Sequence, residues 1–218
     1  AGHEFDKMRK RIERHINQRT EMLSGISHDL RTPLTRMKLQ TAFIKDKSLA
    51  DKLTEDINEM EKMLNEYLQF TSSSFIEKDE LFDLSELMTE VVNKYDNKNI
   101  AKEIPSRVYF NGRKNLIKRC LNNLIENSIK YGNKLNIELS KNKTNLVIKV
   151  EDDGPGIPES EYENVFKPFY KIDKGRAESK SSVGLGLSIA SDIVRSHGGN
   201  IKLSKSSLNG LEVRIFLP

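Results

Sequence analysis

Apolar residues recur every three or four positions through the first third of the chain, which is the spacing of one face of an α-helix. One run comprises Met8, Ile12, Ile16, Leu23, Ile26, Leu30, Leu34 and Met37, and the next comprises Leu49, Leu53, Ile57, Met60, Leu64 and Tyr67. Between the runs, Ser48 can cap the second helix, with Asp51 at the reciprocal position of a capping box. The pattern predicts two long helices that form an antiparallel hairpin.

The apolar seam of this hairpin is too long for one hairpin to cover. Two copies can cover it, because paired hairpins place all four apolar stripes inside one bundle. We therefore expect residues 1–72 to form a homodimer through a four-helix bundle.

The pattern changes after the polar stretch "TSSSFIEKDE", and we assign residues 73–82 to a linker. Asp83 precedes a helical run as its N-cap, "RVYF" indicates a strand closed by an "NG" turn, and a helix continues to Tyr131. "LNIELS" and "LVIKVED" alternate like the strands of a hairpin, and a helix over about 185–196 precedes the strands "NIKLS" and "LEVRIFL". Residues 83–218 therefore read as an α/β sandwich, and the whole chain as α+β.

Composition narrows the class of protein. With 36% hydrophobic and 31% charged residues among 218, the chain is typical of soluble globular domains, and no signal peptide is visible. No stretch approaches the roughly 18 apolar residues of a membrane-spanning helix. The net charge of +4 is small, and no nucleic-acid partner is expected. The only cysteine, Cys120, excludes an internal disulfide and lies on an apolar helical stripe, as a core residue would.

Basic residues gather near the start of the chain with helical spacing, at Lys7, Arg9, Lys10, Arg11, Arg14 and Arg19. Such a run forms either a solvated helix face or a surface that lies near anionic lipid.

The stretch "SGISHDLRTPLTR", residues 24–36, places an imidazole in the first helix. At about 100° per residue, His28 lies some 200° from Ile26 and Leu30, so it projects away from the seam. Thr32 lies one turn further along the same face. An unprotonated imidazole beside a carboxylate, here Asp29, is a competent nucleophile.

A proline follows one turn after the histidine. Pro33 removes a backbone donor and crowds the carbonyl group of Asp29, so the helix should bend there. The alternative reading of this stretch is a surface histidine beside a helix kink.

Four further motifs have nucleotide-binding chemistry. "NLIENSIKYG" puts Asn123, Asn127 and Lys130 on one helical face, where an amide oxygen suits Mg²⁺ and an ammonium group meets phosphate. In "VEDDGPGIP", an aspartate with two glycines can accept a hydrogen bond from adenine while the backbone passes close to the base. "VFKPFYKIDKGR" and "SSVGLGLSIA" follow, and the latter suits phosphate at a helix N-terminus. Taken singly, these stretches could be polar surface or tight turns.

With "SHDLRTPLTR", these motifs in this order resemble the cytoplasmic catalytic core of sensor histidine kinases of two-component systems, and in wording its EnvZ-like osmosensing members. The resemblance implies a dimerisation and histidine phosphotransfer domain over 1–72 and a Bergerat-type (GHKL) catalytic ATP-binding domain over 83–218. It implies that His28 attacks the γ-phosphate of ATP, with Asp29 as acid/base and orienting partner. It also implies that Thr32 positions the water that hydrolyses a phosphorylated response regulator.

The resemblance also assigns the ATP and Mg²⁺ site. Asn127 would ligate Mg²⁺ with help from Asn123, and Asp152 would read adenine. Phe166 and Phe169 would anchor a lid, whose segments between residues 157 and 183 should be mobile without ATP. Lys171 stands where the family usually has arginine, and Ser182 replaces the first glycine of the last motif. The other expected nucleotide contacts are Lys130, Tyr131, Gly154, Gly156, Ile172, Val183, Gly184, Leu185, Gly186 and Leu187.

The implied partners are a second copy of the chain and the receiver domain of an OmpR-like response regulator. Phosphorylation between subunits is expected, as is a full-length sensor anchored in a bacterial inner membrane with this part in the cytoplasm. Two alternatives remain. Another ATPase of the same fold, of chaperone or mismatch-repair type, would lack the hairpin motif, and an inactive dimeric scaffold would fail to bind nucleotide with Mg²⁺.

Overall fold

The computed structural model describes residues 2–73, 77–95, 99–142, 144–172 and 184–218. Contacts divide the chain into two compact units, Ala1–Ile76 and Glu77–Pro218, and each is described by itself. None of the helices in the described ranges combines the length and the apolar character needed to cross a membrane.

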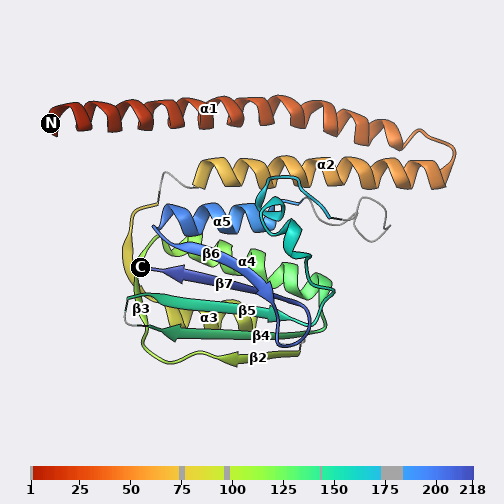
Figure 1. The fold of residues 1–218 in the computed structure, drawn as a ribbon. Coiled ribbons are helices and arrows are strands. Elements are labelled where there is room, and N and C mark those ends of the chain that lie inside the picture. Colours follow the sequence, from red (N-terminus) through yellow and green to blue (C-terminus); the bar gives the residue numbers. More distant parts are fainter. Residues whose placement is uncertain (1, 74–76, 96–98, 143, 173–183) are drawn as a thin grey trace. The chain divides into compact units, whose positions relative to one another are not determined.

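The first unit is the predicted hairpin of α1 (Gly2–Thr41) and α2 (Lys47–Ser73), shown in Figure 1. Polar contacts between described residues join the antiparallel helices: Thr54 Oγ1 donates to Thr41 Oγ1 (3.2 Å), Arg31 Nη2 donates to Asn65 Oδ1 (3.2 Å), and Lys38 Nζ lies 3.4 Å from Glu61 Oε2. Leu34 and Ile57 are buried in the seam. α1 continues through Pro33 without a break.

The cap of α2 differs from the prediction. The helix begins at Lys47, so Asp46 rather than Ser48 holds the capping position. The Asp46 carboxylate accepts a hydrogen bond from the Leu49 amide (3.2 Å), and its carbonyl group accepts one from Ala50 (2.9 Å). An aspartate caps a helix as well as a serine does, so the residue placed one position before the helix takes the role.

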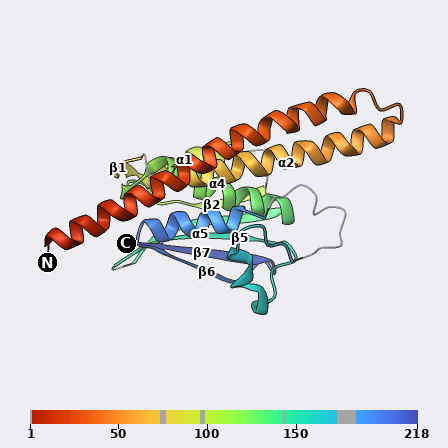
Figure 2. The same ribbon diagram turned by 90° about the horizontal axis from the view of Figure 1, so that it is seen from above.

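The second unit is a two-layer α/β sandwich (Figures 1 and 2). Its strands are β1 (Glu80–Asp83), β2 (Asn99–Glu103), β3 (Tyr109–Gly112), β4 (Lys134–Lys141), β5 (Leu146–Asp152), β6 (Asn200–Lys205) and β7 (Leu211–Leu217). Its helices are α3 (Leu84–Asn93), α4 (Lys114–Tyr131) and α5 (Gly186–Ser196), with single turns η1 (Glu159–Glu161) and η2 (Asn164–Phe166).

The main sheet has the order β2-β4-β5-β7-β6, and β1 pairs with β3 in a separate ribbon. β2 runs parallel to β4, and the other neighbours are antiparallel. Alternate residues of the sheet face the helices and form the core, as Ile137, Val150 and Val213 do along one row. The polar residues between them face the open side.

Several local predictions are confirmed. Asp83 caps α3 by accepting hydrogen bonds from the amides of Ser85 (2.9 Å) and Glu86 (3.2 Å). Cys120 is buried, and burial raises the pKa of its thiol to about 12, so at neutral pH it is an inert core residue.

The boundary between the segments differs from the expected linker over 73–82. α2 continues to Ser73, the second unit begins at Glu77, and Glu80–Asp83 forms β1. The "NG" pair is not a turn either, because Asn111 and Gly112 are the last residues of β3, opposite Leu81 and Glu80.

Candidate active site

Three polar residues predicted from the sequence share one side of α4. Asn123, Asn127 and Lys130 are all half-buried. The Nζ atom of Lys130 and the Nδ2 atom of Asn123 are buried, and neither has a hydrogen-bond partner among the described residues. The Nζ atom of Lys130 lies 5.2 Å from the centroid of the Tyr131 ring, but a buried ammonium group without a hydrogen-bond partner is still costly. This arrangement therefore favours an anionic ligand at this side of α4.

The end of α4 packs against the segment that follows β5. A Cβ atom added to Gly154 would lie 2.7 Å from the carbonyl oxygen of Tyr131, and one added to Gly132 would lie 3.1 Å from Asp152 Cβ. Only glycine allows this close approach. The structure thus brings Tyr131 beside Asp152 and Gly154, as the predicted site requires.

Asp153, which the sequence motifs did not predict as a site residue, forms hydrogen bonds across the same junction. Its Oδ1 atom accepts hydrogen bonds from the amides of Asn133 (2.6 Å) and Lys134 (2.9 Å). The bond from Lys134, followed by that from Asn133, lowers the pKa of the Asp153 carboxyl group. The turn from α4 into β4 is thereby tied to the "DDG" segment.

Asp152 is 1% exposed and is the last residue of β5. Its Oδ1 atom accepts hydrogen bonds from the amides of Gly154 (3.0 Å) and Leu211 (3.1 Å). Within the described ranges, nothing donates to its Oδ2 atom, which leaves one carboxylate oxygen for a ligand. Gly156 has φ of +69°, which favours glycine there, and it packs against Gly210.

The two later motifs meet through a backbone bond. The amide of Phe169 donates to the carbonyl oxygen of Gly184 (3.0 Å), and both residues have positive φ, +64° and +78°. A Cβ atom on Gly184 would lie 2.8 Å from the Tyr170 carbonyl oxygen, so this contact requires glycine.

The remaining residues of these motifs have varied environments. Phe166 and Lys171 are half-buried, and Phe169 and Ile172 are exposed. Ser182 and Val183 lie outside the described residues, so their predicted roles stay predictions.

α5 begins within the last motif, at Gly186. Leu185 is buried and precedes the helix, which has no side-chain cap, while Gly186 and Leu187 open its first turn. A Cβ atom on Gly186 would lie 3.8 Å from the Asn123 carbonyl oxygen, so the start of α5 adjoins α4. Uncapped amide groups carry partial positive charge and bind phosphate. They lie beside the helix that carries Lys130.

The predicted phosphoacceptor residues lie in α1 of the other unit. His28 is within α1, but its side chain lies outside the description. Asp29 and Thr32 are exposed.

A hollow of about 460 Å³ lies elsewhere in the second unit, between α3 and residues 104–107. Three carboxylates line it, Asp83, Glu86 and Glu90, and Glu90 is paired with Lys118 (2.6 Å). The lining of this hollow includes Arg107 but none of the described residues of the site on α4.

The α/β sandwich belongs to a known class of ATPase domains. The model of the "Histidine kinase-, DNA gyrase B-, and HSP90-like ATPase" family matches residues 112–218, which include all of the α4, Asp152 and α5 positions. The "His Kinase A (phospho-acceptor) domain" matches residues 18–74, which include His28. With both domains in this order, the chain belongs to the sensor histidine kinases.

Relatives named as sensor histidine kinases align along almost the whole chain. GtrS of Pseudomonas aeruginosa is 34% identical over 98% of this chain and 45% of its own length. CpxA of Escherichia coli is 31% identical over 100% of this chain and 51% of its own. The chain spans about half the length of the curated relatives it matches. These names do not include EnvZ, so the EnvZ-like subtype stays a prediction.

A solved structure shows the same fold. Full-length ShkA in complex with AMPPNP has a TM-score of 0.68 and 20% identity, over 91% of this chain and 45% of that chain.

Proposed function

We propose that the chain is the catalytic core of a sensor kinase that uses ATP and Mg²⁺ to phosphorylate His28. The phosphoryl group then passes to an aspartate of a response regulator receiver domain. One observation carries the nucleotide part of this proposal. Two buried nitrogen atoms without hydrogen-bond partners among the described residues, Lys130 Nζ and Asn123 Nδ2, lie on the helix that adjoins the uncapped start of α5.

Different residues of the site would contact the base and the phosphates of the nucleotide. The Oδ2 atom of Asp152 can accept a hydrogen bond from the adenine amino group. Lys130 and the first amides of α5 can meet phosphate oxygens. Phe169, Lys171 and Ile172 would border the bound nucleotide.

Mg²⁺ fits this donor set as a metal shared with phosphate. No group of three or more His, Cys, Asp or Glu residues in the described ranges could hold a metal by itself. The amide oxygen of Asn127 is a suitable ligand for a cation that keeps most of its other bonds to phosphate and water, and Asn123 would assist. Mg²⁺ would neutralise charge on the phosphates.

The reaction is a phosphoryl transfer. The lone pair of an unprotonated nitrogen of His28 forms a bond to the γ-phosphorus while the bond to the β–γ bridging oxygen breaks, and ADP leaves. Asp29 would hold the ring in its reactive tautomer and accept its proton. Catalysis then consists mainly of positioning and of stabilising charge on the phosphate oxygens.

Apolar residues along the hairpin support a homodimer. Ile26, Leu30 and Met37 of α1 are 40%, 45% and 39% exposed, and Leu49 and Met60 of α2 are 48% and 51% exposed. Side chains with seam spacing that stay exposed in one chain are what a second hairpin would cover. We infer a four-helix bundle of two chains, with phosphorylation between subunits.

The finer assignments follow the sequence resemblance. Thr32, exposed and one turn from His28, would orient the water that removes phosphate from the regulator. The regulator would be of the OmpR-like type, and the subtype EnvZ-like. The full-length protein would be a sensor anchored in the inner membrane upstream of this part, which would lie in the cytoplasm.

Labelling with γ-³²P-ATP tests the central proposal. The wild-type chain should acquire an acid-labile, base-stable label, and His28→Gln should acquire none while it still binds ADP. Thr32→Ala should keep the label and lose phosphatase activity. Acid-stable label on His28→Gln would refute the assignment.

Mixed dimers test the subunit arrangement. When His28→Gln chains exchange with Asn127→Ala chains, label on the Asn127→Ala chain indicates transfer between subunits. Verified mixed dimers without label would show that each chain phosphorylates itself.

A further inference from the structure

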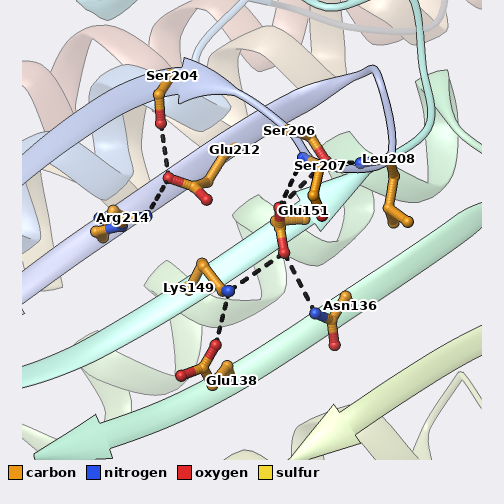
Figure 3. A network of polar contacts seen from close by, with 10 residues as sticks. All are labelled: Asn136, Glu138, Lys149, Glu151, Ser204, Ser206, Ser207, Leu208, Glu212 and Arg214. Atoms are coloured by element: carbon orange, nitrogen blue, oxygen red, sulfur yellow. Dashed lines mark hydrogen bonds and ion pairs between the residues drawn. The ribbon is translucent and has the colours of Figure 1, made fainter.

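Two adjacent carboxylates at the end of β5 point to opposite faces of the sheet, because side chains alternate along a strand. Glu151 lies on the open face (Figure 3). Asp152 lies on the face covered by helices, as the core residue Val150 two positions earlier does. Glu151 is nevertheless only 2% exposed. Burial of a carboxylate is costly unless it is well paired, so the sequence retains this charge at an energetic cost.

Five hydrogen bonds and ion-pair contacts surround the Glu151 carboxylate. Its Oε1 atom accepts hydrogen bonds from the Ser207 amide (3.0 Å), Ser207 Oγ (3.0 Å) and Ser206 Oγ (3.3 Å). Its Oε2 atom meets Asn136 Nδ2 (3.2 Å) and Lys149 Nζ (3.3 Å). Burial acts to raise the pKa of Glu151, but the bonds from Ser207 and Asn136 and the charge of Lys149 together lower it. Glu151 is therefore ionised at neutral pH.

The neighbouring strand β7 makes the position of Glu151 unfavourable for a carboxylate, because it already carries one there. Glu212 lies directly opposite Glu151 on β7, and like charges in that position repel. Glu212 has its own partners, Ser204 Oγ (2.6 Å) and Arg214 Nη2 (2.7 Å). Lys149 is shared with Glu138 (2.7 Å). Glu151 therefore depends most on the serines of the β6–β7 turn.

That turn, residues 206–210, has a compact conformation. The Ser206 amide donates to the Gly210 carbonyl oxygen (2.9 Å), and the Leu208 amide donates to Ser206 Oγ (2.9 Å). Asn209 has φ of +75° and donates its amide to the Ser206 carbonyl oxygen (3.0 Å). The serines at its start are thus coupled to Gly210 at its end.

The end of the same turn contacts Asp152 from the other side. A Cβ atom on Gly210 would lie 2.4 Å from Asp152 Oδ1 and 2.5 Å from the Gly154 amide nitrogen, so no larger residue fits without movement. The next amide, of Leu211, donates to Asp152 Oδ1 (3.1 Å). Glu151 and Asp152 therefore hold one turn from the two faces of the sheet.

We propose that Glu151 is a positioning residue for recognition of the nucleotide base. It anchors Ser206 and Ser207, the turn holds the Leu211 amide on Asp152 Oδ1, and Asp152 keeps Oδ2 directed at the adenine amino group. This inference rests on the proposed binding of an adenine nucleotide by Asp152.

Glu151→Gln tests the proposal with little change in shape. The variant replaces one acceptor oxygen of the carboxylate with an NH₂ donor. In one orientation this donor would face the donors of Ser207, and in the other it would face those of Asn136 and Lys149. Loss of one well-aligned hydrogen bond to the base corresponds to about fivefold weaker binding. We expect ADP to bind the variant about fivefold more weakly in calorimetry on the full chain, with Mg²⁺.

Base selectivity separates positioning from a general structural effect. IDP carries a carbonyl oxygen where ADP carries the amino group, so it measures the bond to Asp152. The preference for ADP over IDP should fall by about the same fivefold in Glu151→Gln. It should not fall further when Glu151→Gln is added to Asp152→Asn, because the two act through one contact.

Glu138→Gln is the matched control. Glu138 shares Lys149 on the same open face but does not touch the turn, so this variant should keep the affinity and selectivity of the wild type. If Glu151→Gln does not fold, Ser207→Ala, which removes one donor to Glu151, provides the same two measurements. Equal weakening of ADP and IDP, or no weakening, would overturn the proposal. Absence of ADP binding by the wild-type chain would instead refute the proposed function.

Discussion

The N-terminus of α4 is capped by a residue far away in the sequence. Glu77 accepts hydrogen bonds from the amides of Asn115 (2.7 Å) and Leu116 (3.3 Å). Arg113, which precedes the helix, provides no side-chain cap. The first turn of the helix that carries the nucleotide residues thus depends on the start of the second unit.

We predict that Glu77→Ala destabilises the second unit. Loss of a helix cap costs about 1 kcal/mol, and loss of a negative charge at a helix N-terminus costs about 0.3–1 kcal/mol more. The expected loss is therefore about 1–2 kcal/mol, or about 3–6 °C in the melting temperature of a unit of this size. Glu77→Gln keeps an acceptor without the charge, so it should lose less.

Tyrosine fluorescence during thermal unfolding can follow this change, because every tyrosine except Tyr67 lies in the second unit. Amide hydrogen exchange should also become faster at Asn115 and Leu116. The exposed neighbour Lys78, replaced by alanine, is the control and should melt like the wild type. If Glu77→Ala melts like the wild type, or if Lys78→Ala loses as much, the cap does not stabilise α4 as argued.

Further predictions concern close packing and pH. Gly210→Ala should lower the free energy of unfolding in urea by about 1–3 kcal/mol, because its Cβ atom would lie 2.4 Å from Asp152 Oδ1. Gly25→Ala, whose Cβ atom meets nothing within 4 Å, should raise it by about 0.5–1 kcal/mol. Equal effects of the two variants would contradict the packing argument. Burial lowers the pKa of His197, whose Nε2 atom accepts a hydrogen bond from the Arg113 amide (3.0 Å). Because the unfolded chain then binds the proton first, the contribution of His197 should be complete above the ordinary histidine pKa of 6.5 and fall as pH drops below it. The difference in unfolding free energy between wild type and His197→Gln should therefore shrink from pH 8 to pH 5, and a constant difference would refute this.

Elements whose structure depends on neighbouring residues could be predicted from local sequence patterns. The helical spacing of α1 and α2, the cap of α3 by Asp83, and the β4–β5 hairpin all follow from neighbouring residues. The motifs with nucleotide-binding chemistry also lie within short stretches, so the sequence alone predicts Asp152 and Lys130 as nucleotide contacts.

Features that depend on distant partners could not be predicted in this way. β1 lies in a polar stretch and becomes a strand because it pairs with β3. β2 is a mostly exposed strand without alternation, and only its pairing with β4 defines it. The contact of Gly210 with Asp152 likewise joins a turn and a strand end that are far apart in the chain. The "NG" pair at residues 209–210 indicates a turn, but not which carboxylate it meets.

The two edges of the main sheet are β2 and β6. Lys102 and Glu103 lie in β2, where Lys102 Nζ donates to Asn93 Oδ1 (2.7 Å), and Lys202 and Lys205 lie in β6. Short, charged edge strands resist the addition of a strand from another molecule. In the proposed homodimer, self-association would therefore be confined to the apolar hairpin, and the sheets would not join edge to edge into larger aggregates.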